Sequence, residues 1–326
     1  MIFDKKTLEA VTRGAAYITE EDGWFFFHRY TAEQEAHGLE IRGGSYHKQM
    51  LSGAGIRLAF YTDAPSISFR WRMEPNGNSR PYGFGDIRVN DVLVGHFGGR
   101  EEAMAGDASV TLPGTRCLVE IYLPYTKHAY LANITADGEI TPHHREKVMI
   151  SYGDSITHGY DAQYPSLAYA PLLAKLCGAD SYNKAIGGDV FDARMLEPDE
   201  PVSPDIVTVA FGTNDWTRKS RETLLADATA YLQALSTRFP AAKIFALSPI
   251  WRADHARETA FGAPTSAVYD VIREAAAGLA NVHVINCWHF IGQDAGMFGD
   301  GSLHPNDLGF ADYARGVYAA MQADCD

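Results

Sequence analysis

The segment Met149–Gly159, MISYGDSITHG, changes from apolar residues to small and polar ones within a few positions. Its first half has the character of a buried strand, and its second half places Ser155 among polar residues and glycines. Two interpretations are open. The segment is a strand that ends in an ordinary turn, in which Gly supplies a positive φ and polar side chains bond their own backbone. Alternatively, Ser155 is a nucleophile at the edge of a sheet, and its chemical partners must then occur later in the chain.

The sequence that surrounds this segment alternates apolar runs with an amphipathic pattern. Four apolar runs occur, at 148–152, 206–211, 244–250 and 282–287. A stripe with a 3.6-residue period extends from Leu224 to Leu235 and indicates a helix. Continuous apolar strands that alternate with helices predict a parallel sheet covered on both faces. Such sheets bind ligands beyond the carboxyl ends of their strands, where we expect Ser155 and Asn214.

The N-terminal part of the chain has a period of two instead. Ile67, Phe69, Trp71 and Met73 alternate with polar residues and would share one face of a strand. Further short strands are predicted at 56–60, 87–89 and 117–123, with turn residues between them. This pattern is typical of an antiparallel sandwich of the jelly-roll kind. We therefore expect an all-β jelly-roll domain over residues 1–145, followed by a three-layer α/β/α domain over residues 146–326.

A serine nucleophile needs a base and a place for negative charge. His304 lies in a polar loop, DGSLHPND at 300–307, before the last helical pattern, and Asp300 lies in the same loop. Asn214 follows an apolar strand and could offer its amide to an oxyanion, and Gly188 could offer an unobstructed backbone N–H. Each motif taken singly is also compatible with an ordinary turn.

Taken together, the motifs resemble those of the SGNH, or GDSL-type, hydrolases over roughly residues 146–320. The resemblance rests on GDS at 153–155, NKAIGG at 183–188, GTND at 212–215 and LHP at 303–305. It implies that Ser155 is the nucleophile and His304 the base. It also implies that the N–H groups of Ser155 and Gly188 and the side-chain amide of Asn214 form the oxyanion hole.

The position of the acid departs from the family pattern. The family places it three residues before the histidine, where this chain has Gly301, and Asp300 lies one residue earlier. We favour Asp300 as the residue that orients His304 through a bulged turn. The alternative is that backbone carbonyls orient His304, as the resemblance allows.

A jelly-roll domain followed by an SGNH domain is similar to bacterial two-domain esterases that deacetylate carbohydrates. The resemblance implies a serine esterase that acts on short acetyl esters, with an acetylated oligosaccharide as the favoured substrate. Trp216, an aromatic residue that closely follows Asn214, and His158, which adjoins the segment of Ser155, are candidate substrate contacts. One alternative is a lipid or thioester acylhydrolase on the same fold. Another is a non-catalytic carbohydrate-binding protein. No cofactor or metal is expected, because His283, Cys287 and His289 lie in or beside an apolar run rather than forming a typical ligand set.

The composition excludes other classes of function. The 326 residues are 46% hydrophobic and 21% charged, which fits a globular chain of two domains. A net charge of −13 argues against nucleic acid as a partner. No run of 18 apolar residues predicts a membrane span, and the start lacks the apolar region of a signal peptide. With four scattered cysteines, these features predict a cytoplasmic protein. The sequence leaves the oligomeric state open, with a homo-oligomer as one alternative.

Overall fold

The computed structural model describes residues 1–100 and 104–323, which form two compact units. Unit 1 comprises Met1–Glu146 with the short segments Tyr164–Ser166 and Asp180–Tyr182. Unit 2 comprises the remainder, Lys147–Gln163, Leu167–Ala179 and the chain from Asn183 onward. The boundary expected from the sequence lay between residues 145 and 146. The two short later segments of unit 1 carry no signal in the sequence.

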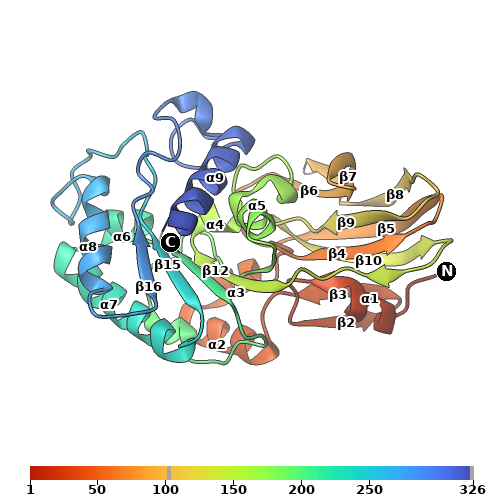
Figure 1. The fold of residues 1–326 in the computed structure, drawn as a ribbon, viewed down its shortest axis with the longest axis horizontal. Coiled ribbons are helices and arrows are strands. Elements are labelled where there is room, and N and C mark those ends of the chain that lie inside the picture. The colour runs from red at the N-terminus through yellow and green to blue at the C-terminus, as the bar shows by residue number, and fades with distance from the viewer. Residues whose placement is uncertain (101–103, 324–326) are drawn as a thin grey trace. The chain divides into compact units, whose positions relative to one another are not determined.

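Unit 1 consists mainly of two antiparallel sheets (Figure 1). One sheet has the order β1-β4-β9-β6-β7, with β11 also paired to β4, and the other has the order β2-β3-β10-β5-β8. The elements of this unit are α1 (Lys5–Val11), β1 (Thr12–Arg13), β2 (Tyr17–Glu21), β3 (Trp24–His28), α2 (Ala32–Arg42), α3 (Gly44–Met50), β4 (Arg57–Thr62), β5 (Ser66–Pro75), β6 (Tyr82–Val89), β7 (Val92–Arg100), β8 (Ala105–Thr111), β9 (Cys117–Tyr122), β10 (Lys127–Ala136) and β11 (Thr141–Pro142).

The core of unit 1 is made by the inward faces of both sheets. Ile67, Phe69, Trp71 and Met73 of β5 are all buried, as their alternation predicted. They belong to one apolar cluster with residues of β4, β9 and β10 from both sheets. Burial of alternate residues on two facing sheets is what stabilises a sandwich. The antiparallel β part of the predicted fold is therefore confirmed.

Unit 2 is built on a sheet with the strand order β13-β12-β14-β15-β16, in which β12, β14, β15 and β16 pair in parallel. The strands β12, β14, β15 and β16 correspond to the four predicted apolar runs. The elements from residue 147 onward, among which η1 and β13 overlap the two short segments counted with unit 1, are β12 (Lys147–Gly153), α4 (Ser155–His158), η1 (Pro165–Leu167), α5 (Tyr169–Leu176), β13 (Ala179–Asn183), η2 (Ala193–Leu196), β14 (Ile206–Ala210), α6 (Thr213–Arg218), α7 (Arg221–Arg238), β15 (Lys243–Leu247), η3 (Thr265–Ala267), α8 (Val268–Ala275), β16 (Val282–Ile285), η4 (Ala295–Met297) and α9 (Asp307–Ala323).

The helices of unit 2 cover both faces of this sheet. From β12 the chain moves outward to β13, then returns past β12 and builds β14, β15 and β16 in the opposite direction. Parallel crossovers are right-handed. The helix between β12 and β13 therefore lies on one face of the sheet, and the helices that connect β14, β15 and β16 lie on the opposite face. Accordingly, α5 packs with α9 and α7 packs with α8. Figure 1 shows α7 and α8 on one side of β15 and β16 and α9 on the other. The predicted α/β class is confirmed.

The reversal of direction at β12 determines where polar side chains converge. In the register of the sheet, Gly153 at the end of β12 pairs with Ala210 at the end of β14. The turns that follow both strands therefore leave the sheet at the same edge. This edge, beside the point where the strand order reverses, is where open α/β sheets bind ligands. Ser155 follows the first of these strands and Asn214 follows the second.

Within residues 1–100 and 104–323, no helix is both long and apolar enough to cross a membrane. Cys117 and Cys287 are buried free thiols, Cys177 is partly buried, and Cys325 lies outside the described residues.

Candidate active site

The candidate nucleophile begins a single helical turn. Ser155 is the first residue of α4, and the preceding Asp154 caps the helix by accepting a hydrogen bond from the Ile156 N–H at 3.0 Å. The helix ends at Gly159, whose φ of +108° reverses the chain. A Cβ on Gly153 would lie 2.2 Å from Thr157 Oγ1, so the strand can approach α4 this closely only because residue 153 is a glycine. This turn fixes the direction of the Ser155 side chain.

A continuous chain of hydrogen bonds joins Ser155, His304 and Asp300. Ser155 Oγ lies 2.8 Å from His304 Nε2, and His304 Nδ1 lies 2.7 Å from Asp300 Oδ2. Because an ionised carboxylate only accepts hydrogen bonds, Nδ1 carries the proton and Nε2 is left to accept the Ser155 hydroxyl. Ser155 and His304 are both buried. The structure thus places a hydroxyl, an imidazole and a carboxylate in the order that activates a serine.

The loop that carries His304 is organised by Asp300 itself. Asp300 Oδ1 accepts hydrogen bonds from the N–H groups of Ser302, Leu303 and His304, at 2.9, 2.8 and 3.1 Å. The extra residue of this loop is Gly301, which has a φ of +72° that favours glycine. Burial acts to raise the pKa of Asp300, but hydrogen bonds from His304, Leu303 and Ser302 outweigh it and lower that pKa below its ordinary value. The carboxylate is therefore ionised at neutral pH.

The two other candidate oxyanion donors are connected to each other. Gly188 has a φ of +82°, and its carbonyl accepts a hydrogen bond from Arg218 Nη1 at 2.7 Å. The Asn214 side-chain amide donates to the Asp189 carbonyl at 3.1 Å and to Asp154 Oδ2 at 3.3 Å. Asn214 lies in the first turn of α6 and Arg218 in its last turn. The two ends of this short helix therefore bond the neighbouring carbonyls of residues 189 and 188.

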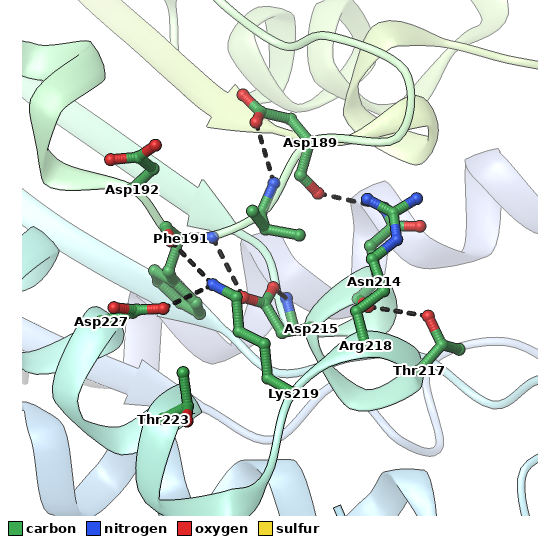
Figure 2. A network of polar contacts seen from close by, with 12 residues as sticks. Asp189, Phe191, Asp192, Asn214, Asp215, Thr217, Arg218, Lys219, Thr223 and Asp227 are labelled. Atoms are coloured by element: carbon green, nitrogen blue, oxygen red, sulfur yellow. Dashed lines mark hydrogen bonds and ion pairs between the residues drawn. The ribbon is translucent and has the colours of Figure 1, made fainter. Parts of the chain in front are cut away.

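A buried ion pair adds to this connection. Figure 2 shows Asp215 of α6 between Lys219 and the backbone of Phe191. Asp215 accepts hydrogen bonds from the N–H groups of Gly212 and Phe191, at 3.0 and 3.2 Å, and its carboxylate lies 2.8 Å from Lys219 Nζ. Lys219 Nζ also donates to the Phe191 carbonyl at 3.0 Å. Fully satisfied buried networks of this kind give segments a single arrangement, which fixed donors require.

Asp154 has an unusually high pKa for a carboxyl group. Its side chain is almost completely buried, and this desolvation raises its pKa to about 7. The hydrogen bond from the Ile156 N–H lowers the pKa, whereas the negative charges of Asp215 and Asp189 raise it further. Asp154 therefore titrates near neutral pH while it accepts a hydrogen bond from the Asn214 amide.

The two residues expected to contact a substrate, Trp216 and His158, are buried in the structure. Trp216 is 0% exposed; its Nε1–H donates to the Ala263 carbonyl at 2.8 Å, and the Arg252 guanidinium lies over its ring. His158 is 1% exposed and packs against the Tyr160 ring. Neither side chain reaches the surface at which a substrate could bind. Each residue follows the polar edge of the sheet in sequence, but its side chain turns into the core.

The sequence also failed to indicate one acidic residue of the site. Asp161 Oδ2 lies 3.9 Å from His304 Nδ1, and the ring of Tyr160 lies against the His304 ring with centroids 5.7 Å apart. Asp161, Asp300 and His304 form the one group of at least three His, Cys, Asp or Glu side chains in the described chain that could hold a metal ion. Since Asp300 accepts from His304 Nδ1 at 2.7 Å, hydrogen bonding accounts for the arrangement without a metal. No motif distinguishes Asp161 from an ordinary turn residue.

Comparison with protein families agrees with this geometry. Residues 151–311 match the model of the GDSL-like Lipase/Acylhydrolase family. The chain carries a GDSL-type acylhydrolase domain. It is therefore an ester-hydrolysing enzyme, as its sequence motifs predicted. The matched residues include Ser155, Gly188, Asn214 and His304. Comparison with curated proteins gives no match.

Solved structures with the same fold cover almost the whole chain. A salicylyl-acyltransferase from a tetracycline biosynthetic pathway aligns with a TM-score of 0.79 and 22% identity, over 96% of this chain and 94% of that chain. A GDSL-like lipase from Bacteroides ovatus, so described in its title, aligns with a TM-score of 0.76 and 18% identity, over 99% and 97%. A family two carbohydrate esterase from Clostridium thermocellum, in complex with cellohexaose, aligns with a TM-score of 0.66 and 13% identity, over 84% and 94%. These likenesses concern the fold of the chain.

Proposed function

We propose that this protein is a serine esterase that removes short acyl groups, acetyl in particular, from carbohydrate esters. The observation that carries the proposal is the hydrogen-bonded series Ser155–His304–Asp300, with contacts of 2.8 and 2.7 Å. A histidine in an ordinary exposed turn would not accept a hydrogen bond from a buried serine hydroxyl while a carboxylate accepts one from its other nitrogen. The same geometry is what nucleophilic catalysis by serine requires.

In the acylation step, His304 Nε2 removes the Ser155 hydroxyl proton as Oγ attacks the ester carbonyl. The negative charge that develops on the carbonyl oxygen is held by the N–H groups of Ser155 and Gly188 and by the Asn214 amide. Asp300 keeps the proton on Nδ1 and stabilises the imidazolium that forms. Collapse of the tetrahedral intermediate breaks the bond to the alcohol, which leaves with the proton from His304 Nε2.

In the deacylation step, water attacks the acyl group on Ser155 while His304 Nε2 takes its proton. The second tetrahedral intermediate releases the carboxylic acid, and Ser155 Oγ recovers its proton from His304. Atoms and charges balance over the two steps, and all the side chains and backbone N–H groups that take part belong to unit 2. The proposed roles of Ser155, His304, Asp300, Gly188 and Asn214 are those implied by their family motifs.

The proposed substrate is an acetylated carbohydrate. This choice is supported by the likeness of most of the chain to family two carbohydrate esterases, one of which was solved with cellohexaose. A lipid or thioester acylhydrolase would use the same machinery on longer acyl chains. A non-catalytic carbohydrate-binding protein would have no use for the hydrogen-bonded serine.

The first test measures hydrolysis of nitrophenyl acetate, butyrate and octanoate, and release of acetate from acetylated oligosaccharides. We expect kcat/KM to be highest for acetate, and we expect acetate release from at least one acetylated sugar. Transfer of acetyl to an added alcohol is measured in the same reactions. Efficiency that climbs from acetate to octanoate would point to the lipid alternative, and dominant transfer to alcohol would make the protein an acyltransferase.

The second test asks whether Ser155 and His304 carry the reaction. Ser155→Ala and His304→Ala should lose nearly all turnover, and Ser155→Ala should lose labelling by a fluorophosphonate. Ser302→Ala and His289→Ala are matched controls, because Ser302 lies in the loop of His304 and His289 is exposed. Turnover in Ser155→Ala close to that of the wild type would refute the assignment. Absence of both labelling and turnover in the wild type would favour a binding protein.

A further inference from the structure

A second carboxylate faces the nitrogen of His304 that Asp300 binds. Asp161 Oδ2 lies 3.9 Å from His304 Nδ1, beyond hydrogen-bonding distance, while Asp300 Oδ2 lies at 2.7 Å. The ligand atoms of Asp161, Asp300 and His304 all lie within 4.8 Å of one another. The Asp161 side chain is 13% exposed and that of His304 is 11% exposed, so water screens this pair only partly.

The backbone holds Asp161 in this position by two unusual features. Asp161 has a φ of +74°, a left-handed conformation that is uncommon for residues other than glycine and that Asn and Asp adopt most readily. In addition, a Cβ on Gly299 would lie 2.6 Å from Asp161 Cβ, so the loop of His304 can approach only because residue 299 is a glycine. Backbone strain that the surrounding structure maintains often accompanies a functional position.

The position of Asp161 in the sequence connects the two halves of the proposed machinery. Asp161 follows α4, whose first residue is Ser155, and Tyr160 between them packs against the His304 ring. The segment that presents the nucleophile therefore also presents a negative charge to the base. Asp300, by contrast, reaches His304 from within its own loop.

We propose that Asp161 is a second positioning carboxylate for His304, an inference that rests on the proposed esterase function. Two carboxylates beside a neutral imidazole repel each other, but both are attracted to the imidazolium that forms when His304 takes the Ser155 proton. The two carboxylates therefore stabilise the transition state, in which His304 is charged, more than they stabilise the resting enzyme. This difference is the condition for accelerating a reaction. Asp161 also gives Nδ1 a second acceptor when the bond to Asp300 is lost.

The inference predicts that the effects of the two carboxylates are coupled. Asp161→Asn keeps the size of the side chain and its tolerance of a positive φ while removing the charge. We expect Asp161→Asn to lower kcat about tenfold, the factor that corresponds to one pKa unit of lost charge stabilisation, and to change KM less than about twofold. In the Asp300→Asn background the same substitution should cost clearly more, because no carboxylate then remains. Asp294→Asn is the control, because Asp294 caps η4 in the same part of the chain through a 2.7 Å bond from the Gly296 N–H.

Two readouts separate this role from a merely structural one. The rate of Ser155 labelling by a fluorophosphonate should fall with kcat, because labelling needs the base but no sugar. The steady-state loss should fall on kcat rather than on KM, because the charge of Asp161 acts on the imidazolium that forms during the reaction and not on the bound substrate. The groups that face the His304 ring are Asp300 from its own loop and Ser155, Tyr160 and Asp161 from the segment that starts at α4.

The outcomes distinguish failure of this inference from failure of the proposed function. If the wild type is neither labelled nor active, the esterase proposal fails and this inference fails with it. If the wild type is labelled and Asp161→Asn behaves like Asp294→Asn in all readouts, the inference alone is overturned. Should Asp161→Asn melt at a much lower temperature, Gly299→Ala provides the second variant, because it keeps the carboxylate but crowds it. A Gly299→Ala enzyme with the wild-type labelling rate would overturn the inference.

Discussion

Replacement of Asp154 by Asn should change how the stability of the protein depends on pH. Burial raises the pKa of Asp154 from 3.8 to about 7 in the folded state. The native protein therefore binds this proton more tightly than the unfolded chain does. The stabilisation is fully present below pH 3.8 and is lost as the pH rises through about 7. Asn keeps the shape of the side chain and an oxygen to accept from the Ile156 N–H, but it never ionises.

The magnitude follows from the size of the shift. Each pKa unit corresponds to about 1.4 kcal/mol, so a shift of about three units gives an upper limit of about 4 kcal/mol. Most of this falls in an accessible range. Between pH 5 and 8, the free energy of unfolding of Asp154→Asn should rise by about 3 kcal/mol relative to that of the wild type. The lost acceptor for the Asn214 amide adds a cost that does not vary with pH, so the slope is the signature and the offset is not.

The assay is urea unfolding of both proteins at several pH values from 5 to 8, followed by far-UV circular dichroism. Asp270→Asn is the control, because its exposed carboxylate faces Arg273 at the surface and should give a flat difference. A difference between Asp154→Asn and the wild type that stays constant from pH 5 to 8 would refute the reasoning. It would mean that Asp154 has an ordinary carboxyl pKa in the native state.

Three further substitutions test other parts of the structure. Asn214→Ala should lower kcat by about 10²–10³ with little change in KM, measured by steady-state kinetics, because it removes one oxyanion donor. Trp216→Ala should cost about 3–5 kcal/mol in urea unfolding, because it empties a buried site, while the folded fraction keeps its KM. Lys184→Met should cost about 3–5 kcal/mol, because the Glu200 carboxylate, now 2.9 Å from Lys184 Nζ, would be buried without a cation. Adding Glu200→Gln to Lys184→Met should recover part of that loss, and no recovery would contradict the interpretation of this pair.

The sequence predicted the parallel sheet well because most of its strands are buried on both faces. A strand buried in this way must be apolar along most of its length, so β12, β14 and β15 each leave a continuous apolar run. The strand β13 (Ala179–Asn183) was not predicted, because its sequence ADSYN is polar and has no clear period. In unit 1, β7 was missed for a related reason, since glycines interrupt its alternation.

The candidate site shows the same division between local and tertiary information. The motifs located Ser155 and His304, but the reach of Asp300 to His304 depends on the backbone of Gly301, which the sequence allowed without requiring. The burial of Trp216 could not be predicted, because it depends on residues that lie far along the chain, such as Arg252 and Ala263. Asp161 could not be found, since its approach to His304 depends on the absence of a side chain at Gly299. Contacts made by shape alone leave no motif.

The two oxygens of Asp300 make the readiness of the base depend on the order of one loop. Oδ1 binds three N–H groups of this loop, Oδ2 binds His304, and the loop closes on itself through the bond from the Gly299 N–H to the His304 carbonyl at 2.8 Å. Segments held mainly by their own hydrogen bonds can open while the rest of a domain stays folded. Heat inactivation of this enzyme should then begin below the melting temperature of the sheet and be reversible on cooling. Amide hydrogen exchange of Leu303 and His304 should report the same opening.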